Sequence, residues 1–548
     1  MRRDRGIESV ALAAIVAAAL VPPIVGVLSS IDLAAPSSGI AVALTARDLV
    51  TTAWAVAAIA LVATLLGWPV GWRMSRIAPR RGLIFLLPLL LPSYLAYAGW
   101  STLRAPGTWL GDWLLGGFVG SAAAPLTAGT TTAGTTAVTA ATNSLPLIAS
   151  RLTAIVGLAL WGWPIVAAWV AAGARAFPSD ALDAMRLDGA TARARALEVV
   201  RATWHLALVG GAVLALVMGG SAVPLHVAQL DTLAIRAWRL LDELPAGEHW
   251  RVWAACWPVV GIGWLGAMLL WRGMRRTGDI GESGEMGGRG GSGRLGSSAA
   301  VWTIWGASAV VPALLAAWSL RSGDSLWRFW RVAGPSAWAS ATIALATGAV
   351  AIGLAVLTWR ALDRGGPSAR AAGAALLASL VGALTPGVLI GAGAARGWAL
   401  VPEWLAETDV PLVLAHVARF GAVGVMAGWW MWASEPRERR ELRAMEAGQG
   451  WRAWWEGAGC GRAGELVAAG IVAGVLSLHE IESAVMLRPA SSSGGGLAWM
   501  LLQWLHFARM EELSAGILWM FGVAVAAAGA AAGLARLGAN RNREASTP

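Results

Sequence analysis

Twelve apolar segments, each about as long as a lipid bilayer is thick, constrain this chain of 548 residues more than any other feature. A helix that crosses the hydrocarbon layer needs about 20 apolar residues, and it must bond its own backbone polar groups. The sequence therefore predicts an all-α polytopic membrane protein with about twelve transmembrane helices. The segments are 7–29, 49–72, 83–101, 152–173, 205–225, 252–271, 299–319, 335–359, 371–395, 412–433, 466–487 and 517–535.

Composition excludes several classes of protein. Hydrophobic residues make up 57% of the chain and charged residues 14%, which leaves too little polar surface for a soluble protein of this size. Every one of the 42 basic residues is Arg, and a phosphate-binding P-loop needs a Lys. We therefore expect no nucleotide-binding site of the P-loop type in this chain, and no enzyme. The two cysteines and six histidines predict no disulfide framework, metal site or cofactor.

The distribution of Arg predicts how the chain crosses the membrane. If the N-terminus is cytoplasmic, the cytoplasmic segments hold 29 Arg and the opposite side holds 11. This asymmetry is typical of the positive-inside rule. We expect both termini in the cytoplasm, residues 7–29 as an uncleaved first helix, and a location in a bacterial inner (plasma) membrane, in contact with lipid.

A Gly/Ser/Arg-rich segment at 272–298 predicts a flexible cytoplasmic linker. It separates residues 1–271 from residues 299–548, with six spans on each side. Both halves begin in the cytoplasm, so we expect two parallel six-helix repeats. Local similarity supports a duplication: "SAVPL" (221–225) resembles "SAVML" (483–487), and each is followed by an amphipathic stretch, at 232–243 and 496–507. The Thr/Ala/Gly-rich loop at 121–144 is expected to be a non-cytoplasmic insertion.

A charged segment joins the fourth and fifth spans of each half, at 174–204 and at 434–465. In the first, a helix is expected to start at Ser179 or Asp180 and to break at Gly189, because glycine lowers helix propensity by about 1 kcal/mol. An amphipathic helix on anionic lipid is one interpretation. Two matched segments on one face favour another, which is a docking site for two copies of a soluble partner.

The sequence "DAMRLDG" (183–189) resembles the EAA motif of bacterial ABC importer permeases, in which Glu-Ala-Ala is followed after three residues by Gly. Met185 replaces the second Ala. In "ELRAMEAGQG" (441–450), Leu442 and Arg443 replace both Ala residues, and neither half has the closing Leu-Pro. The residues that keep or stand in for the motif are Asp183, Ala184, Gly189, Ala190, Glu441, Ala447 and Gly448.

The six-plus-six layout makes the chain similar to fused double-domain permeases of type I importers, such as those for ferric iron or thiamine. The resemblance implies that both loops couple to a separate ATP-binding subunit, expected to be a dimer, at the cytoplasmic face. It also implies a periplasmic or lipid-anchored solute-binding protein, and no nucleic-acid partner. The solute could be ferric iron, thiamine, a polyamine or another small molecule.

Two other functions stay open. A major-facilitator-type secondary transporter also has six plus six spans with a central linker. The basic loop at 71–82 resembles that family's loop, although Ser75 and Ala78 replace its Asp and Gly. A degenerate membrane scaffold that no longer transports is the third hypothesis, because the second EAA-like segment has diverged.

Charged residues near the outer part of the eleventh span form a candidate translocation site. In a continuous helix, His479 and Glu482 share one face and Glu480 lies on another. Ionisable groups in a span usually face a cavity or the bundle interior. With Arg419 they could line the solute path; a structural salt bridge to Arg419, or exposure at the membrane surface, is the alternative. The aligned first-half residues, Val217, Met218 and Gly220, make any such site asymmetric.

Overall fold

The computed structural model describes residues 6–31, 45–75, 82–104, 134–174, 179–280, 299–320, 322–435, 437–446, 450–487, 496–507 and 509–544. These residues form helices and turns, with no β-strand among them. Eleven of the described helices are long and apolar enough to cross a membrane, and a bent pair would bring the number to twelve. The predicted all-α, multi-span architecture is confirmed at this level.

The candidate spans before residue 281 are α1 (Ile7–Ser29), α2 (Ala46–Met74), the bent pair η2 (Leu83–Leu90) and α4 (Ser93–Ser101), α6 (Gly134–Ala174), α8 (Ala192–Gly219) and α11 (His249–Ile280). Those after residue 298 are α12 (Ala299–Trp305) with the π-helical turn η6 (Gly306–Val310) and α13 (Val311–Trp318), α14 (Asp324–Arg364), α15 (Gly366–Leu384), α18 (Val410–Ala433), α20 (Trp451–Trp454) with η7 (Trp455–Gly459) and α21 (Cys460–Leu478), and α24 (Met510–Glu544).

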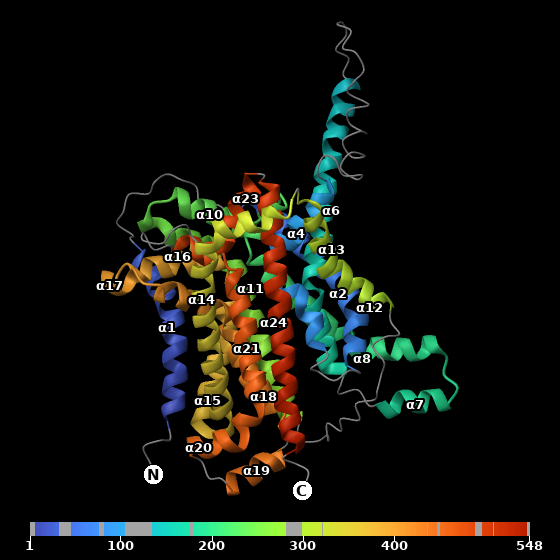
Figure 1. The fold of residues 1–548 in the computed structure, drawn as a ribbon, viewed down its shortest axis with the longest axis vertical. Coiled ribbons are helices and arrows are strands. Elements are labelled where there is room, and N and C mark those ends of the chain that lie inside the picture. Colours follow the sequence, from blue (N-terminus) through green and yellow to red (C-terminus); the bar gives the residue numbers. More distant parts are fainter. Residues whose placement is uncertain are drawn as a thin grey trace.

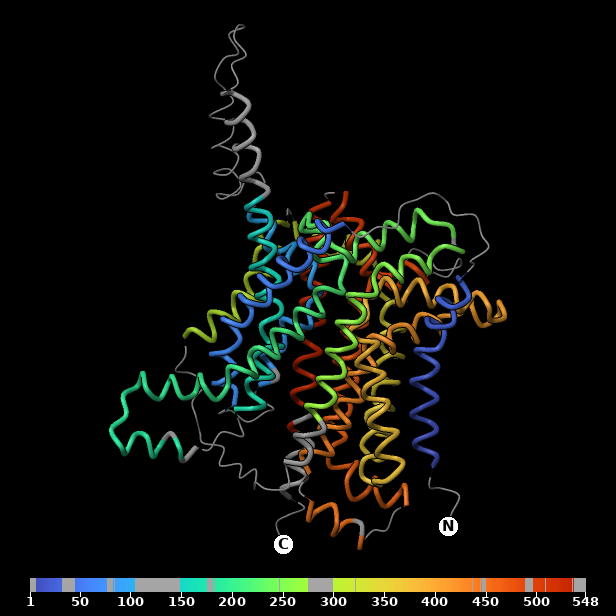
Figure 2. Tube along the Cα trace, turned by 180° about the vertical axis from the view of Figure 1, so that it is seen from behind, coloured from blue at the N-terminus to red at the C-terminus, as the bar shows by residue number. Residues whose placement is uncertain are grey.

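The start of α1 and the end of α24 lie at the same end of the bundle, which we call the inner end (Figure 1). The short helix α19 (Arg437–Glu446) lies there too, whereas α7 (Ser179–Leu187) projects sideways from the bundle, nearer to this end than to the opposite one. At the opposite, outer end lie α10 (Leu233–Glu243), α16 (Gly387–Trp398), α17 (Glu403–Ala406) and α23 (Gly496–His506). The view from behind agrees, with both ends of the chain at the inner end (Figure 2).

The first and last spans of each sequence half pack on helices of the other half. Helix α1 lies against α15 and α16, and α11 also contacts α15. In return, α13 contacts α4, and α24 contacts η2. The α1–α16 contact depends on small residues, because a Cβ built on Gly26 would lie 1.8 Å from the Gly393 carbonyl oxygen. Close backbone approach at glycine is the usual basis of packing between membrane helices.

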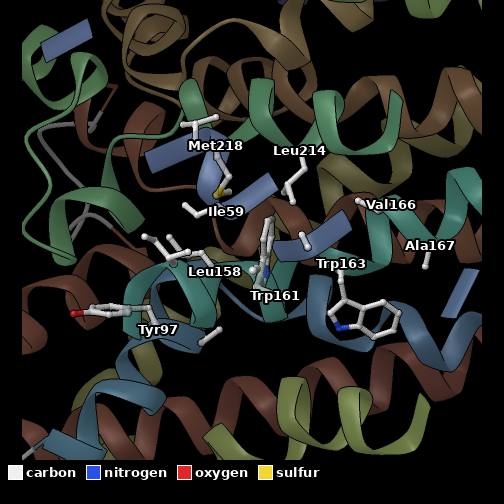
Figure 3. Close-up of a cluster of buried hydrophobic side chains, with 14 of the residues drawn as sticks. Ile59, Tyr97, Leu158, Trp161, Trp163, Val166, Ala167, Leu214 and Met218 are labelled. Carbon is white, nitrogen blue, oxygen red and sulfur yellow. The ribbon is translucent and has the colours of Figure 1, made fainter. Parts of the chain in front are cut away.

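A buried apolar cluster fills the space between α2, α4, α6 and α8 (Figure 3). Ile59, Leu158 and Leu214 are fully buried in it. Trp161 and Trp163 of α6 point their indole N–H groups out of the cluster to bonded partners. Trp163 donates to the Ser308 hydroxyl of η6 at 2.7 Å, which joins the two sequence halves. A buried donor left without a partner would cost about 1–3 kcal/mol, so these bonds help to fix how the helices pack.

Proline residues interrupt two of the predicted spans. Residues 83–101 bend by 86° between η2 and α4, and residues 371–395 are interrupted between Leu384 and Gly387. In both, a proline caps the second helix with an extended ψ, 128° at Pro92 and 131° at Pro386. Proline has no N–H to continue the helical bonds, and it disfavours a helical conformation in the residue before it.

Several predicted loops are shorter than expected, because a neighbouring helix extends into them. Helix α8 begins at Ala192, so the second part of the first charged segment continues directly into the fifth span. Helix α11 extends to Ile280, into the predicted linker, of which 281–298 lies outside the described residues. Within the predicted insertion at 121–144, the part from Gly134 onward belongs to α6, and 121–133 lies outside the described residues. Hydropathy misses such extensions because a helix can run past the apolar segment.

Candidate functional site

Two segments of equal length separate α6 from α8, at 175–191, and α18 from α20, at 434–450. Each contains one short helix, α7 or α19. The break at Gly189 is present, and its φ of 73° is left-handed, a region that favours glycine. Helix α8 then starts after Thr191, whose hydroxyl accepts the Ala194 N–H at 3.2 Å. Similar loops therefore follow the fourth span of both halves.

The first loop is exposed. Asp183 pairs only with Arg186 on its own helix, at 2.7 Å with both side chains about 60% exposed. Ala184 and Gly189 are exposed and Ala190 is half-buried, while Leu187 at the end of α7 is 88% exposed. An exposed ion pair contributes little to stability, about 0–1 kcal/mol. The motif residues of this loop are thus available to a partner.

The second loop is held against the bundle. Glu441 is exposed and pairs with Arg437 at 2.8 Å, whereas Ala447 and Gly448 lie outside the described residues. Arg443 donates to both carboxylate oxygens of Asp363 on α14, at 2.7 and 3.1 Å, and to Glu435 at 2.9 Å. Burial acts to lower the pKa of Arg443, but these two carboxylates raise it above its ordinary value overall. The loops are equal in length but differ in how firmly they are attached.

A further ion cluster continues this attachment into the bundle. Arg360 of α14 donates to Glu8 of α1 at 2.6 Å, and Arg364 pairs with the other oxygen of Glu8. The guanidinium of Arg360 lies 4.2 Å from the ring centre of Trp451, at the start of α20. We call these residues, together with Arg443 and its two partners, the inner-end network. It contains three carboxylates and three guanidiniums: Glu8, Asp363, Glu435, Arg360, Arg364 and Arg443. Sequence reasoning missed this network, although the spacing of Arg360 and Arg364 places them on one helix face.

The charged residues predicted in the eleventh span lie at the other end of α21. Their arrangement differs from the one that a continuous helix would give. Helix α21 ends at Leu478 and α22 (Glu482–Met486) starts after a break, so the assumption of one continuous helix was wrong. As a result, Glu480 and Glu482 both face Arg419 of α18 and do not lie on different faces. His479 lies apart from this group, beside the backbone of Leu90.

Arg419, Glu480 and Glu482 form a buried group that we call the elbow triad. Arg419 Nε lies 3.6 Å from Glu480 Oε2, and Nη1 lies 3.8 Å from Glu482 Oε2. The side chains are 12%, 5% and 4% exposed. Glu480 Oε1 also accepts the backbone N–H and the hydroxyl of Ser483, each at 3.1 Å. The ion pair anticipated between this segment and Arg419 is therefore present.

The elbow triad also touches the first half of the chain. Glu482 Oε1 accepts the Ala222 N–H at 2.5 Å and the Ser221 hydroxyl at 3.3 Å, just before α9 (Val223–Val227). A Cβ on Gly387, the first residue of α16, would lie 2.4 Å from Arg419 Nη1 and 2.5 Å from Glu482 Oε2. Breaks in three helices thus meet around one carboxylate. No sequence pattern indicated that Ser221 and Ala222 would be its partners.

At each of the two proline breaks, the carbonyl group before the proline accepts a hydrogen bond from a different kind of side chain. The Leu91 carbonyl, before Pro92, accepts the indole N–H of Trp161 at 2.8 Å. The Thr385 carbonyl, before Pro386, accepts from Arg419 Nη1 at 3.2 Å. Irregular backbone inside a membrane protein requires such partners. An uncharged donor serves the first break and a charged one serves the second, so the charge at the elbow triad is specific to one half.

The remaining histidines form separate contacts. His416 Nδ1 lies 2.6 Å from the Ser477 hydroxyl, which is 3.4 Å from the Thr347 hydroxyl. At the outer end, His226 stacks on His506 with ring centres 5.5 Å apart. Burial lowers the pKa of His226, and the positive charge that His506 can carry lowers it further. Within the described part of the chain, no group of three or more His, Cys, Asp or Glu side chains is arranged to hold a metal ion.

Comparison of the chain with protein-family models, with curated proteins and with solved structures found no match. The residues and their geometry therefore carry any functional argument by themselves.

Proposed function

We propose that this protein is the membrane-spanning permease subunit of an ABC importer in a bacterial inner membrane, with both termini in the cytoplasm. The observation that carries the proposal is the pair of equal loops, 175–191 and 434–450, after the fourth span of each half and nearer to the inner end of the bundle than to the outer end. A chain without a P-loop lysine needs an external source of energy, and two matched levers on one face would let an ATPase dimer act on both halves.

The helix order supports two parallel six-span repeats. A proline break interrupts the third span of each half. A short helix and then an 11-residue helix follow the fifth span: α9 and α10 in one half, and α22 and α23 in the other. The first and last spans of each half pack on helices of the other half. A rotation of either half would therefore displace helices of both halves. Such a bundle suits two-state rocking driven by a ligand.

In this proposal the solute crosses between the halves, near the breaks around the elbow triad. Broken helices at the meeting of two repeats are a common setting for transport sites. The elbow triad then belongs to the solute path or its gate. His479 lies apart from the triad, so any contact that it makes with the solute would be at a different point of the path. A solute-binding protein would dock at the outer end, and ferric iron is one candidate solute among small molecules.

The test is whether this protein stimulates a candidate ATP-binding subunit from the same organism. The two subunits are co-expressed, purified in lipid nanodiscs and assayed for co-purification and ATP hydrolysis. We expect Leu187→Asp to abolish both, because Leu187, at the end of α7, is an apolar side chain that is 88% exposed. The matched control is Leu400→Asp, since Leu400 is 60% exposed beyond α16. Full coupling in the Leu187 variant would contradict the proposal, and proton-driven uptake by the isolated chain would favour a secondary transporter.

A further inference from the structure

The elbow triad has an excess of negative charge, unlike the inner-end network. In the inner-end network three carboxylates face three guanidiniums. At the elbow, two carboxylates face the single guanidinium of Arg419. An uncompensated charge in a buried site is costly, and such a site commonly becomes neutral by taking up a proton.

One carboxylate oxygen of the triad has no hydrogen-bond partner. Glu482 is 3% exposed, and its Oε1 is occupied by the Ala222 N–H and the Ser221 hydroxyl. Its Oε2 accepts no hydrogen bond and lies 3.8 Å from the nearest guanidinium nitrogen. This oxygen is the position where a proton would remove the charge without breaking a bond that the structure contains.

The space around this oxygen admits a proton more readily than a larger cation. A Cβ on Gly387 would come within 2.5 Å of Glu482 Oε2, so even a methyl group does not fit on that side. Of the charged groups described, Arg419 and Glu480 face Glu482. His416 interacts electrostatically with Glu480, and α9 contributes backbone N–H groups while its His226 faces His506. Apart from His416, which can carry a proton, the described elements around the carboxylate bring no second cation.

We propose that the elbow triad binds one exchangeable proton, shared between Glu480 and Glu482, at the contact between the two halves. The proton comes from water and returns to it, and it converts two carboxylates and one guanidinium into a neutral group. Two carboxyl groups that share a site with one proton are a known arrangement in proteins. The protonation rests on the geometry of the triad, and only its use in gating a solute path rests on the proposed function.

The direct test is infrared spectroscopy of the full chain in lipid nanodiscs, in water and in deuterium oxide. We expect the wild type at neutral pH to show the C=O band of a buried protonated carboxyl group, shifted in deuterium oxide. Glu482→Gln and Glu480→Gln should each lose this band, because one carboxylate then faces one guanidinium. Glu435→Gln, in the balanced inner-end network, is the matched control and should keep it.

Three results would overturn the proposal: a wild type without the band, either elbow Gln variant with the band intact, or loss of the band in the Glu435 variant. A proton on His416 instead would give the first of these results. If an elbow variant fails to fold, titration of the wild type still decides, since the band must disappear as the pH is raised. The measurement involves no transport, so its failure would leave the proposed function untouched.

Discussion

Replacement of Arg443 by Ala should release the second inner loop from the bundle. The Arg443 side chain is 10% exposed and makes three charge-assisted hydrogen bonds, to Asp363 and Glu435, whose side chains are 15% and 13% exposed. Removal of one partner from a buried ion pair typically costs about 3–5 kcal/mol, because the remaining charge is left without compensation. These carboxylates keep some contact with water, so we expect about 3 kcal/mol, the lower end of that range.

A change of this size can be measured by hydrogen exchange of the backbone amides of α19, Arg437–Glu446. Exchange that occurs through local opening reports the free energy of that opening. A loss of about 3 kcal/mol corresponds to exchange roughly 100-fold faster, since about 1.4 kcal/mol is a factor of ten. Arg443→Lys should give an intermediate rate, because Lys keeps the charge but not the bidentate geometry.

Arg437→Ala is the matched control on the same helix. Its pair with Glu441 is exposed, with side chains 62% and 59% accessible, and joins residues four apart. Such pairs contribute about 0.3–0.5 kcal/mol, so exchange should rise by roughly two-fold. If the Arg443 and Arg437 variants exchange at similar rates, the clamp does not hold α19 and the reasoning from burial is refuted.

Three further predictions concern the bundle and its outer end. Gly26→Ala should push α1 away from α16 and lower the free energy of unfolding by about 1–3 kcal/mol. Gly261→Ala is the control and should have no such effect, because a Cβ there would have no atom within 4 Å. Equal melting temperatures for the two variants would contradict the close contact. Trp161→Phe should cost about 1–3 kcal/mol, because the carbonyl at the first proline break loses its donor; an unchanged denaturation midpoint would refute this. The contact of His226 with His506 should be fully stable above the ordinary His pKa of about 6.5 and should weaken as the pH falls below it, because the pKa of His226 is lowered in the folded state. The measurement is cross-linking between α9 and α23 from about pH 7.5 to 5. A constant yield over this range would contradict the prediction.

The sequence was sufficient for features that depend on local composition. Hydropathy located the spans, and Gly189 was expected to break the charged segment because glycine lowers helix propensity. The break is present there, with a left-handed φ of 73°. The sequence was not sufficient where the partner is distant along the chain. Glu480 and Glu482 face one arginine only because the helix stops at Leu478, and the hydrogen bond from Ala222 comes from 260 residues away.

The inner-end network shows the same limit more sharply. Glu8 could be read as an ordinary acidic residue in the first turn of a helix, and Arg360 as one of many positive charges at the cytoplasmic side of a span. Their pairing depends on α1 crossing to the second half, which no local pattern encodes. Exchange of first spans between the halves is a property of the assembled bundle, so a repeat can be recognised in sequence before its packing can.

The two proline breaks suggest why charge is concentrated in one half. Both breaks need a donor for the carbonyl that precedes the proline, and each receives one from the span that leads to the inner loop. Trp161 supplies a neutral N–H and requires nothing further. Arg419 supplies the same bond together with a buried positive charge, which requires an anion nearby. One carboxylate would be enough to balance the charge of Arg419. The second adds hydrogen bonds to the backbone: Glu480 accepts the Ser483 N–H, and Glu482 accepts the Ala222 N–H of the other half, so the two carboxylates together join the broken eleventh span to the first half.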